Sequence, residues 1–424
     1  MDGYFLERLL LTGFRWQTRA AMKFSSGETV LPPAPPRSGS AFLYVHVPFC
    51  EVLCPFCSFH RVQYQEAKAR RYFAALRQEI RRYHEAGFVF TGAYVGGGTP
   101  TVACGELLET LALIRELFPV REISVETNPR DLRDEVIKQL AAAGVDRLSV
   151  GVQSFDDRLL RKMERYEKYG SSAEIQERLQ AAAPFFRTLN ADMIYNLPNQ
   201  SLASLERDLE ILLTLKVNQV SCYPLMTAKS AEFTMSQTMG RPQARRLRPY
   251  FDTILARLRP QFTPQSAWCF ARGDGALDEY IVEADDYVGV GSGAFSYLDG
   301  VMYATTFSLK AYAERVGRGL TGITGQRRLS TAEQMMHAFL VRLFGLKLEK
   351  RWFMDRFGRR KLQALAPMLA ALKLTGALRE SKTAYRLTDR GMYYWVLMMA
   401  SFFESVNAFR EQMRALITAE LEAE

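Results

Sequence analysis

Residues 44–57 read Tyr-Val-His-Val-Pro-Phe-Cys-Glu-Val-Leu-Cys-Pro-Phe-Cys, and this stretch decides how the rest of the chain is interpreted. It places Cys50, Cys54 and Cys57 directly after an apolar segment that is typical of a β-strand. Three thiolates so close in sequence can hold three corners of a cubane [4Fe-4S] cluster and leave the fourth iron free for a reacting ligand. The stretch therefore predicts an iron-sulfur loop at the end of a first strand.

A closed zinc site is the alternative interpretation of these cysteines. Together with His60 they could form a tetrahedral Cys3His site with a purely structural role. We favour the cluster because zinc ligands usually split into two pairs separated by a longer loop, whereas these lie in one compact loop. The remaining cysteines, Cys104, Cys222 and Cys269, stand singly in apolar or helical segments, as small core residues do.

The composition describes an ordinary globular protein. With 424 residues, 48% of them hydrophobic and 24% charged, the chain is long enough for two domains. The first residues lack a basic region and a small-residue cleavage site, so we expect no secretory signal. The longest apolar stretch, residues 392–403, is about half of what a bilayer crossing needs, so we expect no membrane span. A cytoplasmic location fits both expectations, and a low-potential iron-sulfur cluster would survive best in a reducing compartment.

The formal net charge of +9 is spread along the chain. Basic residues concentrate in three segments, 70–82, 241–259 and 351–361, without the interleaved aromatic residues of an RNA-binding surface. We therefore expect no nucleic-acid partner. Most of these charges are interpreted as solvated helix faces, with a minority available to an anionic ligand.

Strand-like and helix-like segments alternate along the first half of the chain. The expected strands are 42–47, 88–95, 122–127, 147–152, 188–195 and 219–223. The expected helices are near 67–84, near 105–118, 133–143, within 154–185, and 202–215. Six strands with helices between them predict an α/β fold with a parallel sheet, a partial six-unit (β/α) barrel whose ligand site lies at the carboxyl ends of the strands.

Three regions follow from these patterns. Residues 1–40 end in closely spaced prolines and are expected to form an N-terminal extension and linker. Residues 41–320 are expected to form the barrel, and residues 321–424 a mostly helical C-terminal domain with helices at 332–344, 349–357 and 361–372. A hairpin within 376–388 and a final helix or pair of helices follow. Helices followed by a hairpin also fit a winged-helix module, but a cap over the barrel is favoured.

Polar residues mark the ends of successive strands. The glycine-rich run at residues 95–101 follows the second strand and lets a ligand approach the main chain closely. Glu126, Gln153 and Asp192 lie within or at the end of later strands, where an unpartnered polar group is costly to bury. Any one of them could be tied to a loop of the barrel itself. Together, beside the glycine turn, they predict one shared polar ligand.

The Cys-x3-Cys-x2-Cys spacing resembles the radical S-adenosylmethionine (SAM) superfamily. In that family the open iron binds the amino and carboxylate groups of SAM, and an electron from the cluster yields a 5'-deoxyadenosyl radical. Further motifs narrow the resemblance, over roughly residues 41–400, to the branch of oxygen-independent coproporphyrinogen III oxidases and heme chaperones. They are Gly-Gly-Gly-Thr-Pro-Thr, Arg-Leu-Ser-Val-Gly-Val-Gln-Ser-Phe, Asp-Met-Ile-Tyr-Asn-Leu-Pro and Asp-Tyr-Val-Gly-Val-Gly-Ser-Gly-Ala.

This resemblance implies roles for individual residues. Cys50, Cys54 and Cys57 would carry the cluster that drives catalysis. Tyr44, Gly97 and Glu126 would hold the cluster-bound SAM, and Phe295 would add an apolar contact. The positions implied around a second SAM site are Phe56, Gly98, Thr99, Gln153, Arg165 and Asp192.

The resemblance also implies an enzyme that acts on a tetrapyrrole, foremost by oxidative decarboxylation like the oxidases. Two alternatives stay open: a heme chaperone, and a radical methyltransferase of the kind that degrades heme. Phe59 stands where the oxidases have a further cysteine. In contrast, residues 268–272 (Trp-Cys-Phe-Ala-Arg) resemble the segment that precedes a late glycine-rich turn in the oxidases. The implied partners are an anionic tetrapyrrole or heme and a low-potential electron donor such as flavodoxin or ferredoxin.

Overall fold

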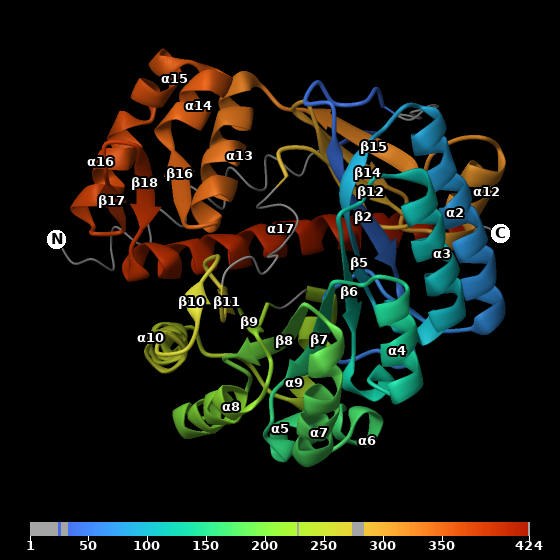
Figure 1. Ribbon diagram of the computed structural model, residues 1–424, viewed down its shortest axis with the longest axis horizontal. Coiled ribbons are helices and arrows are strands. Elements are labelled where there is room, and N and C mark those ends of the chain that lie inside the picture. The colour runs from blue at the N-terminus through green and yellow to red at the C-terminus, as the bar shows by residue number, and fades with distance from the viewer. Residues whose placement is uncertain (1–23, 27–32, 227–228, 274–283, 423–424) are drawn as a thin grey trace.

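A computed structural model describes residues 24–26, 33–226, 229–273 and 284–422. Its centre is a sheet of thirteen strands within these residues, flanked by helices and joined to a smaller C-terminal region by one long helix (Figure 1). The expected N-terminal extension and linker lie mostly outside the described residues.

The middle of the sheet is parallel and contains all six predicted strands. They neighbour one another in chain order as β2 (Ala41–Val47), β5 (Phe90–Gly97), β6 (Glu122–Thr127), β7 (Arg147–Gln153), β8 (Thr188–Tyr195) and β9 (Gln219–Pro224). Most of their residues are buried, as expected where both faces of a parallel sheet are covered. The α/β barrel-like architecture is therefore confirmed.

The sheet extends beyond these six strands on both sides. A seventh parallel strand, β12 (Tyr287–Val290), pairs with β2 and was not predicted. Antiparallel strands complete the two edges, namely β13 (Phe295–Leu298), β14 (Val301–Thr305), β15 (Ile323–Arg328) and β1 (Ser25–Ser26) at one edge and β11 (Cys269–Ala271) and β10 (Thr263–Pro264) at the other. Gly291 and Gly293 adopt positive φ in the turn from β12 to β13, where a side chain would be strained.

Helices of the barrel cover the outside of the sheet, and Figure 1 shows α2, α3 and α4 side by side along it. The α-helices are α2 (Glu66–Glu85), α3 (Cys104–Leu117), α4 (Asp134–Ala142), α5 (Asp157–Lys162), α6 (Tyr166–Tyr169), α7 (Ser172–Ala182), α8 (Leu202–Thr214), α9 (Lys229–Thr238), α10 (Leu247–Leu258) and α12 (Leu309–Gly317). Short 3-10 helices are η1 (Pro100–Ala103), η2 (Pro129–Asp131), η3 (Ala183–Phe185) and η4 (Ala244–Arg246). In α2 the buried residues Tyr72, Phe73, Leu76 and Ile80 recur at helical spacing and face the sheet.

The C-terminal region is mostly helical, as predicted. Its elements are α13 (Thr331–Phe344), β16 (Lys347–Glu349), α14 (Lys350–Phe357), α15 (Arg359–Ala364), α16 (Ala366–Leu374), β17 (Leu378–Glu380), β18 (Ala384–Leu387) and α17 (Asp389–Glu422). The helix expected over 361–372 is two helices, since Pro367 stands in the first turn of α16, where its missing N–H costs least. The final segment is the single helix α17, which crosses the molecule toward the barrel (Figure 1).

The large sheet continues through β15 to Arg328, beyond the expected barrel boundary at residue 320. We therefore propose that the barrel ends near residue 329 and that the remainder forms a cap. Trp395 of α17 donates from Nε1 to the carbonyl of Leu340 in α13 at 2.9 Å, which joins the cap's helices to each other. In the described part of the chain no helix combines the length and apolarity that a bilayer crossing requires.

Candidate active site

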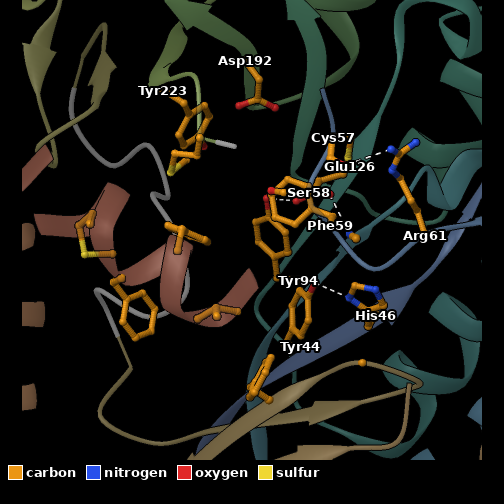
Figure 2. Close-up of a pocket in the computed structure, with 18 of the residues that line it drawn as sticks. Tyr44, His46, Cys57, Ser58, Phe59, Arg61, Tyr94, Glu126, Asp192 and Tyr223 are labelled. Carbon is orange, nitrogen blue, oxygen red and sulfur yellow. Dashed lines mark hydrogen bonds between the residues drawn. The ribbon is translucent and has the colours of Figure 1, made fainter. Parts of the chain in front are cut away.

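A cavity of about 800 Å³ opens at the carboxyl ends of the parallel strands. Every residue that the sequence assigned to the site lines it: Tyr44, Cys50, Cys54, Phe56, Cys57, Gly97, Gly98, Thr99, Glu126, Gln153, Arg165, Asp192 and Phe295. These residues come from at least five strands and their following loops, which meet here because parallel strands end at the same edge. Figure 2 shows Tyr44, Glu126 and Asp192 around this cavity with the cysteine loop beside them.

The cysteine loop begins on a short, fixed segment. Cys50 belongs to β3 (Phe49–Cys50), which pairs with β4 (Val62–Gln63) and closes the loop at its base. The glycine turn packs against the same segment: a Cβ on Gly98 would lie 2.6 Å from the carbonyl oxygen of Phe49. Thr99 Oγ1 lies 3.7 Å from Cys50 Sγ. The loop and the turn are therefore one packed unit at the mouth of the barrel.

The cysteine thiols fit an iron-sulfur cluster. None of the chain's six cysteines, which all lie in the described residues, forms a disulfide. Burial and the neighbouring Cys57 raise the pKa of Cys50 to about 12, so iron must displace its proton on binding. Three thiols on one loop facing one cavity match the donor set of a cluster with an open iron.

The closed zinc site finds no support in the geometry. His60 Nε2 lies 3.1 Å from Ser292 Oγ, and its ring stacks on His46 at 5.8 Å between centroids. Among the described residues, no group of three His, Cys, Asp or Glu side chains is arranged around a single metal ion. Three sulfurs that bind a cubane stand further apart than three that bind one ion, so this arrangement is compatible with the cluster.

Glu126 is held by the glycine turn. Its carboxylate accepts hydrogen bonds from the Gly97 N–H at 2.9 Å and from the Tyr94 hydroxyl at 2.8 Å. A Cβ on Gly96 would lie 2.6 Å from the Glu126 carboxyl carbon, so the turn must lack a side chain there. Burial raises the pKa of Glu126, while these two donors oppose the rise. The remaining lone pairs of the carboxylate are available to a ligand in the cavity.

Asp192 and a buried arginine lie deeper in the barrel. Asp192 accepts from Ser149 Oγ and Asn190 Nδ2, both at 2.8 Å, while burial raises its pKa. The Arg147 guanidinium is 2% exposed and lowers the pKa of both Asp192 and Glu126. A single buried cation thus stabilises two buried carboxylates. Sequence reasoning missed Arg147, although a charged residue inside an apolar strand was a signal.

Gln153 ends β7 in an unusual conformation. Its φ of 73° lies in the left-handed region, which is costly for a residue other than glycine. The following loop is fixed by the buried Asp208, which accepts from Ser154 Oγ and Phe155 N at 2.8 Å each. Strain that the surroundings maintain in this way is typical of functional positions. Gln153 is therefore held at the cavity wall by its neighbours.

Arg165 lies between the cysteine loop and the end of β7. Its Nη1 is 3.5 Å from Cys54 Sγ, and its Nη2 donates to the carbonyl of Gly151. The guanidinium lies over the ring of Tyr169, 4.2 Å from the centroid. The structure thus places Arg165 at the cavity beside Cys54, and the role implied for it at a second SAM site stays a prediction.

The cap supplies an apolar wall of the cavity. Its residues come from α13 and α17 and include Met336, Leu340, Phe344, Met399, Phe402 and Phe403. Sequence reasoning assigned no residue of these helices to the site, because an apolar helix face looks the same whether it meets a core or a cavity. The cavity therefore combines a polar end at the strands with an apolar side at the cap.

Comparisons with known proteins agree with this geometry. The model of the radical SAM superfamily matches residues 44–212. The chain is 30% identical over 362 residues to the oxygen-independent coproporphyrinogen III oxidase of Escherichia coli strain K12, covering 77% of this chain and 78% of the oxidase. It belongs to the radical SAM family of these oxidases and heme chaperones.

Relatives with the two names are about equally similar. The heme chaperone HemW of Bacillus subtilis is 29% identical over 367 residues, covering 82% of this chain and 95% of that protein. A structure of the Escherichia coli oxidase shares the fold with a TM-score of 0.75 over 90% of this chain and 95% of that one, at 24% identity. Membership in this radical SAM family is therefore shown, and relatives of both names occur at similar identity.

Radical SAM proteins use a [4Fe-4S] cluster and SAM, and the cavity of this family member fits both. The three thiols of the cysteine loop match the cluster, and the carboxylate of Glu126 beside the glycine turn matches the amino and hydroxyl donors of SAM. Phe59, which replaces the oxidases' further cysteine, lines the cavity and is 41% exposed.

Proposed function

We propose that this chain is a cytoplasmic radical SAM enzyme that removes a hydrogen atom from a propionate side chain of a tetrapyrrole, which then loses carbon dioxide. One observation carries the proposal: a single cavity joins the cysteine loop to the apolar wall of α13 and α17. A tetrapyrrole combines an apolar macrocycle with carboxylates, so its faces suit the wall and its polar groups suit the strand ends.

We assign different roles to the residues of the cavity. We assign Cys50, Cys54 and Cys57 to the cluster and Glu126 to the donors of SAM. When bound, the cluster and SAM supply a 5'-deoxyadenosyl radical that takes hydrogen from the substrate. The apolar wall excludes water from this reaction and orients the macrocycle. The electron left on the substrate after carbon dioxide departs must pass to a one-electron acceptor.

The cluster also needs a low-potential electron donor, and we propose flavodoxin or ferredoxin in this role. The cysteine loop reaches the surface at Leu53, which is 41% exposed and is not among the residues that line the cavity. An exposed apolar side chain at this position suits the docking of a small redox protein close to the cluster.

A heme chaperone is the second candidate. The chain resembles HemW over 95% of that protein's length, and it has Phe59 where the oxidases have a further cysteine. A carrier would use the same apolar wall to hold heme but would have no need to convert it. Turnover of the tetrapyrrole therefore separates the two functions.

Gln153→Ala is expected to lower tetrapyrrole turnover roughly two- to tenfold while iron content is unchanged. Loss of one hydrogen bond from the amide costs about 0.5–1.5 kcal/mol, or up to roughly tenfold in binding or rate. Product and 5'-deoxyadenosine should be measured in parallel, because misplaced substrate leaves SAM cleavage uncoupled from product formation. Gln153→Gly is the matched control, since it removes the same amide while relieving the strain at φ 73°.

Equal loss in both variants would assign the effect to the amide. Unchanged product formation in both would contradict a role for Gln153 in holding substrate or a second SAM. Wild-type protein that binds heme tightly and converts no tetrapyrrole would replace the enzyme proposal with the chaperone.

A further inference from the structure

Arg61 connects the two halves of the cysteine loop. It lies directly before β4, and its Nη2 donates to the carbonyl oxygens of Cys54 at 2.6 Å and of Cys57 at 3.0 Å. Figure 2 shows Arg61 reaching toward Cys57 beside the cavity. Because Arg61 adjoins β4 at the base of the loop, its hydrogen bonds link Cys54 and Cys57 to that base.

The base of the loop is held independently of Arg61. Cys50 pairs with Gln63, and the Tyr64 N–H donates to the Cys50 carbonyl at 2.8 Å. Between Cys54 and Cys57 the backbone makes one bond, from the Cys57 N–H to the Cys54 carbonyl at 3.2 Å. The guanidinium therefore adds two hydrogen bonds to a segment in which one backbone bond joins the two cysteines.

The charge of Arg61 lies beside Cys54 and Cys57, whose carbonyl oxygens accept hydrogen bonds from its Nη2. Its Nη1 is buried and has no hydrogen-bond partner among the described residues, and the side chain lines the cavity. The nearby Arg130 is paired with Glu51 at 2.7 Å, so those two charges offset each other. Arg61 thus places a cation, with one N–H group that has no partner among the described residues, next to two of the residues that would carry the cluster.

We propose that Arg61 is a positioning residue that fixes Cys54 and Cys57 and raises the reduction potential of the cluster. Reduction adds one negative charge to the cluster, and a nearby cation stabilises that charge. Net charge and hydrogen bonds at the sulfurs are known determinants of cluster potential. The inference rests on the cluster of the proposed function but not on any turnover of tetrapyrrole.

The test is a redox titration of anaerobically reconstituted full-length protein, without substrate, followed by the electron paramagnetic resonance signal of the reduced cluster. In Arg61→Met the ratio of oxidised to reduced cluster at a given potential should rise at least tenfold. This corresponds to a fall of about 59 mV in the reduction potential of the cluster for a one-electron couple. Arg61→Lys keeps the charge and should recover most of the potential. Arg318→Gln, at the exposed end of α12, is the control for loss of one positive charge and should match wild type.

Iron and sulfide contents decide how the titration is interpreted. A wild-type potential in fully loaded Arg61→Met would overturn the inference, and reduced SAM affinity at that unchanged potential would assign Arg61 to SAM instead. If Arg61→Met holds no cluster, Arg61→Lys decides: a wild-type potential supports the role of charge, and a tenfold shift contradicts it. Wild-type protein that binds no iron would defeat the proposed function itself, which is a separate result.

Discussion

Replacing Cys50, Cys54 or Cys57 with alanine is expected to abolish binding of the iron-sulfur cluster. Anaerobically reconstituted wild-type protein should contain about four irons and as many sulfides, whereas each variant should contain almost none. The reason is the donor set: a cubane with one open iron has three protein ligands, and the loss of any one leaves two irons without a protein ligand. Iron and sulfide analysis measures the effect directly.

Cys104→Ala is the matched control for this loss. Cys104 begins α3, its Sγ lies 3.6 Å from Oε1 of Gln139 in α4, and it is not among the residues that line the cavity. Its variant should keep the full iron content. Stoichiometric zinc without iron in anaerobically purified wild-type protein would contradict the assignment and restore the closed zinc site.

Glu126→Ala is expected to weaken SAM binding about 10- to 150-fold while the cluster is retained. A hydrogen bond that involves a charged group contributes about 1.5–3 kcal/mol, and the carboxylate of Glu126 is positioned by Gly97 and Tyr94 to accept such bonds. Equilibrium binding of SAM to the reconstituted variant checks the result.

Glu122→Gln controls for a change of charge on the same strand. Glu122 lies at the opposite end of β6 and pairs with Arg187, so this variant should bind SAM as wild type does. If Glu126→Ala and wild type bind SAM equally well, the role assigned to Glu126 is wrong.

The parallel core of the fold was predictable because local patterns determine it. Strand-like segments such as residues 122–127 and 188–195 alternate with amphipathic helices, and that alternation specifies a parallel sheet. β12 was missed because Tyr287–Val290 is short and contains a glycine, which gives little local signal. Its pairing with β2 joins residues more than 200 positions apart and depends on the assembled barrel.

The candidate site was also predicted in part. Glu126 and Asp192 were predicted because the carboxyl ends of parallel strands meet at one edge of the sheet, independently of how the helices pack. A cap over the barrel was predicted, but the apolar wall of α13 and α17 was missed, because an apolar helix face looks the same whether it meets a core or a cavity. Arg61 was missed as well, because its importance depends on which backbone carbonyls it reaches.

One measurement tests the central claim most directly. Reconstituted protein should be incubated anaerobically with SAM, a low-potential reductant, a one-electron acceptor and coproporphyrinogen deuterated on its propionate side chains. We expect deuterium in the 5'-deoxyadenosine together with a decarboxylated tetrapyrrole, because the radical formed in the cavity takes its hydrogen from that side chain. Unlabelled 5'-deoxyadenosine with the tetrapyrrole recovered unchanged would contradict the account.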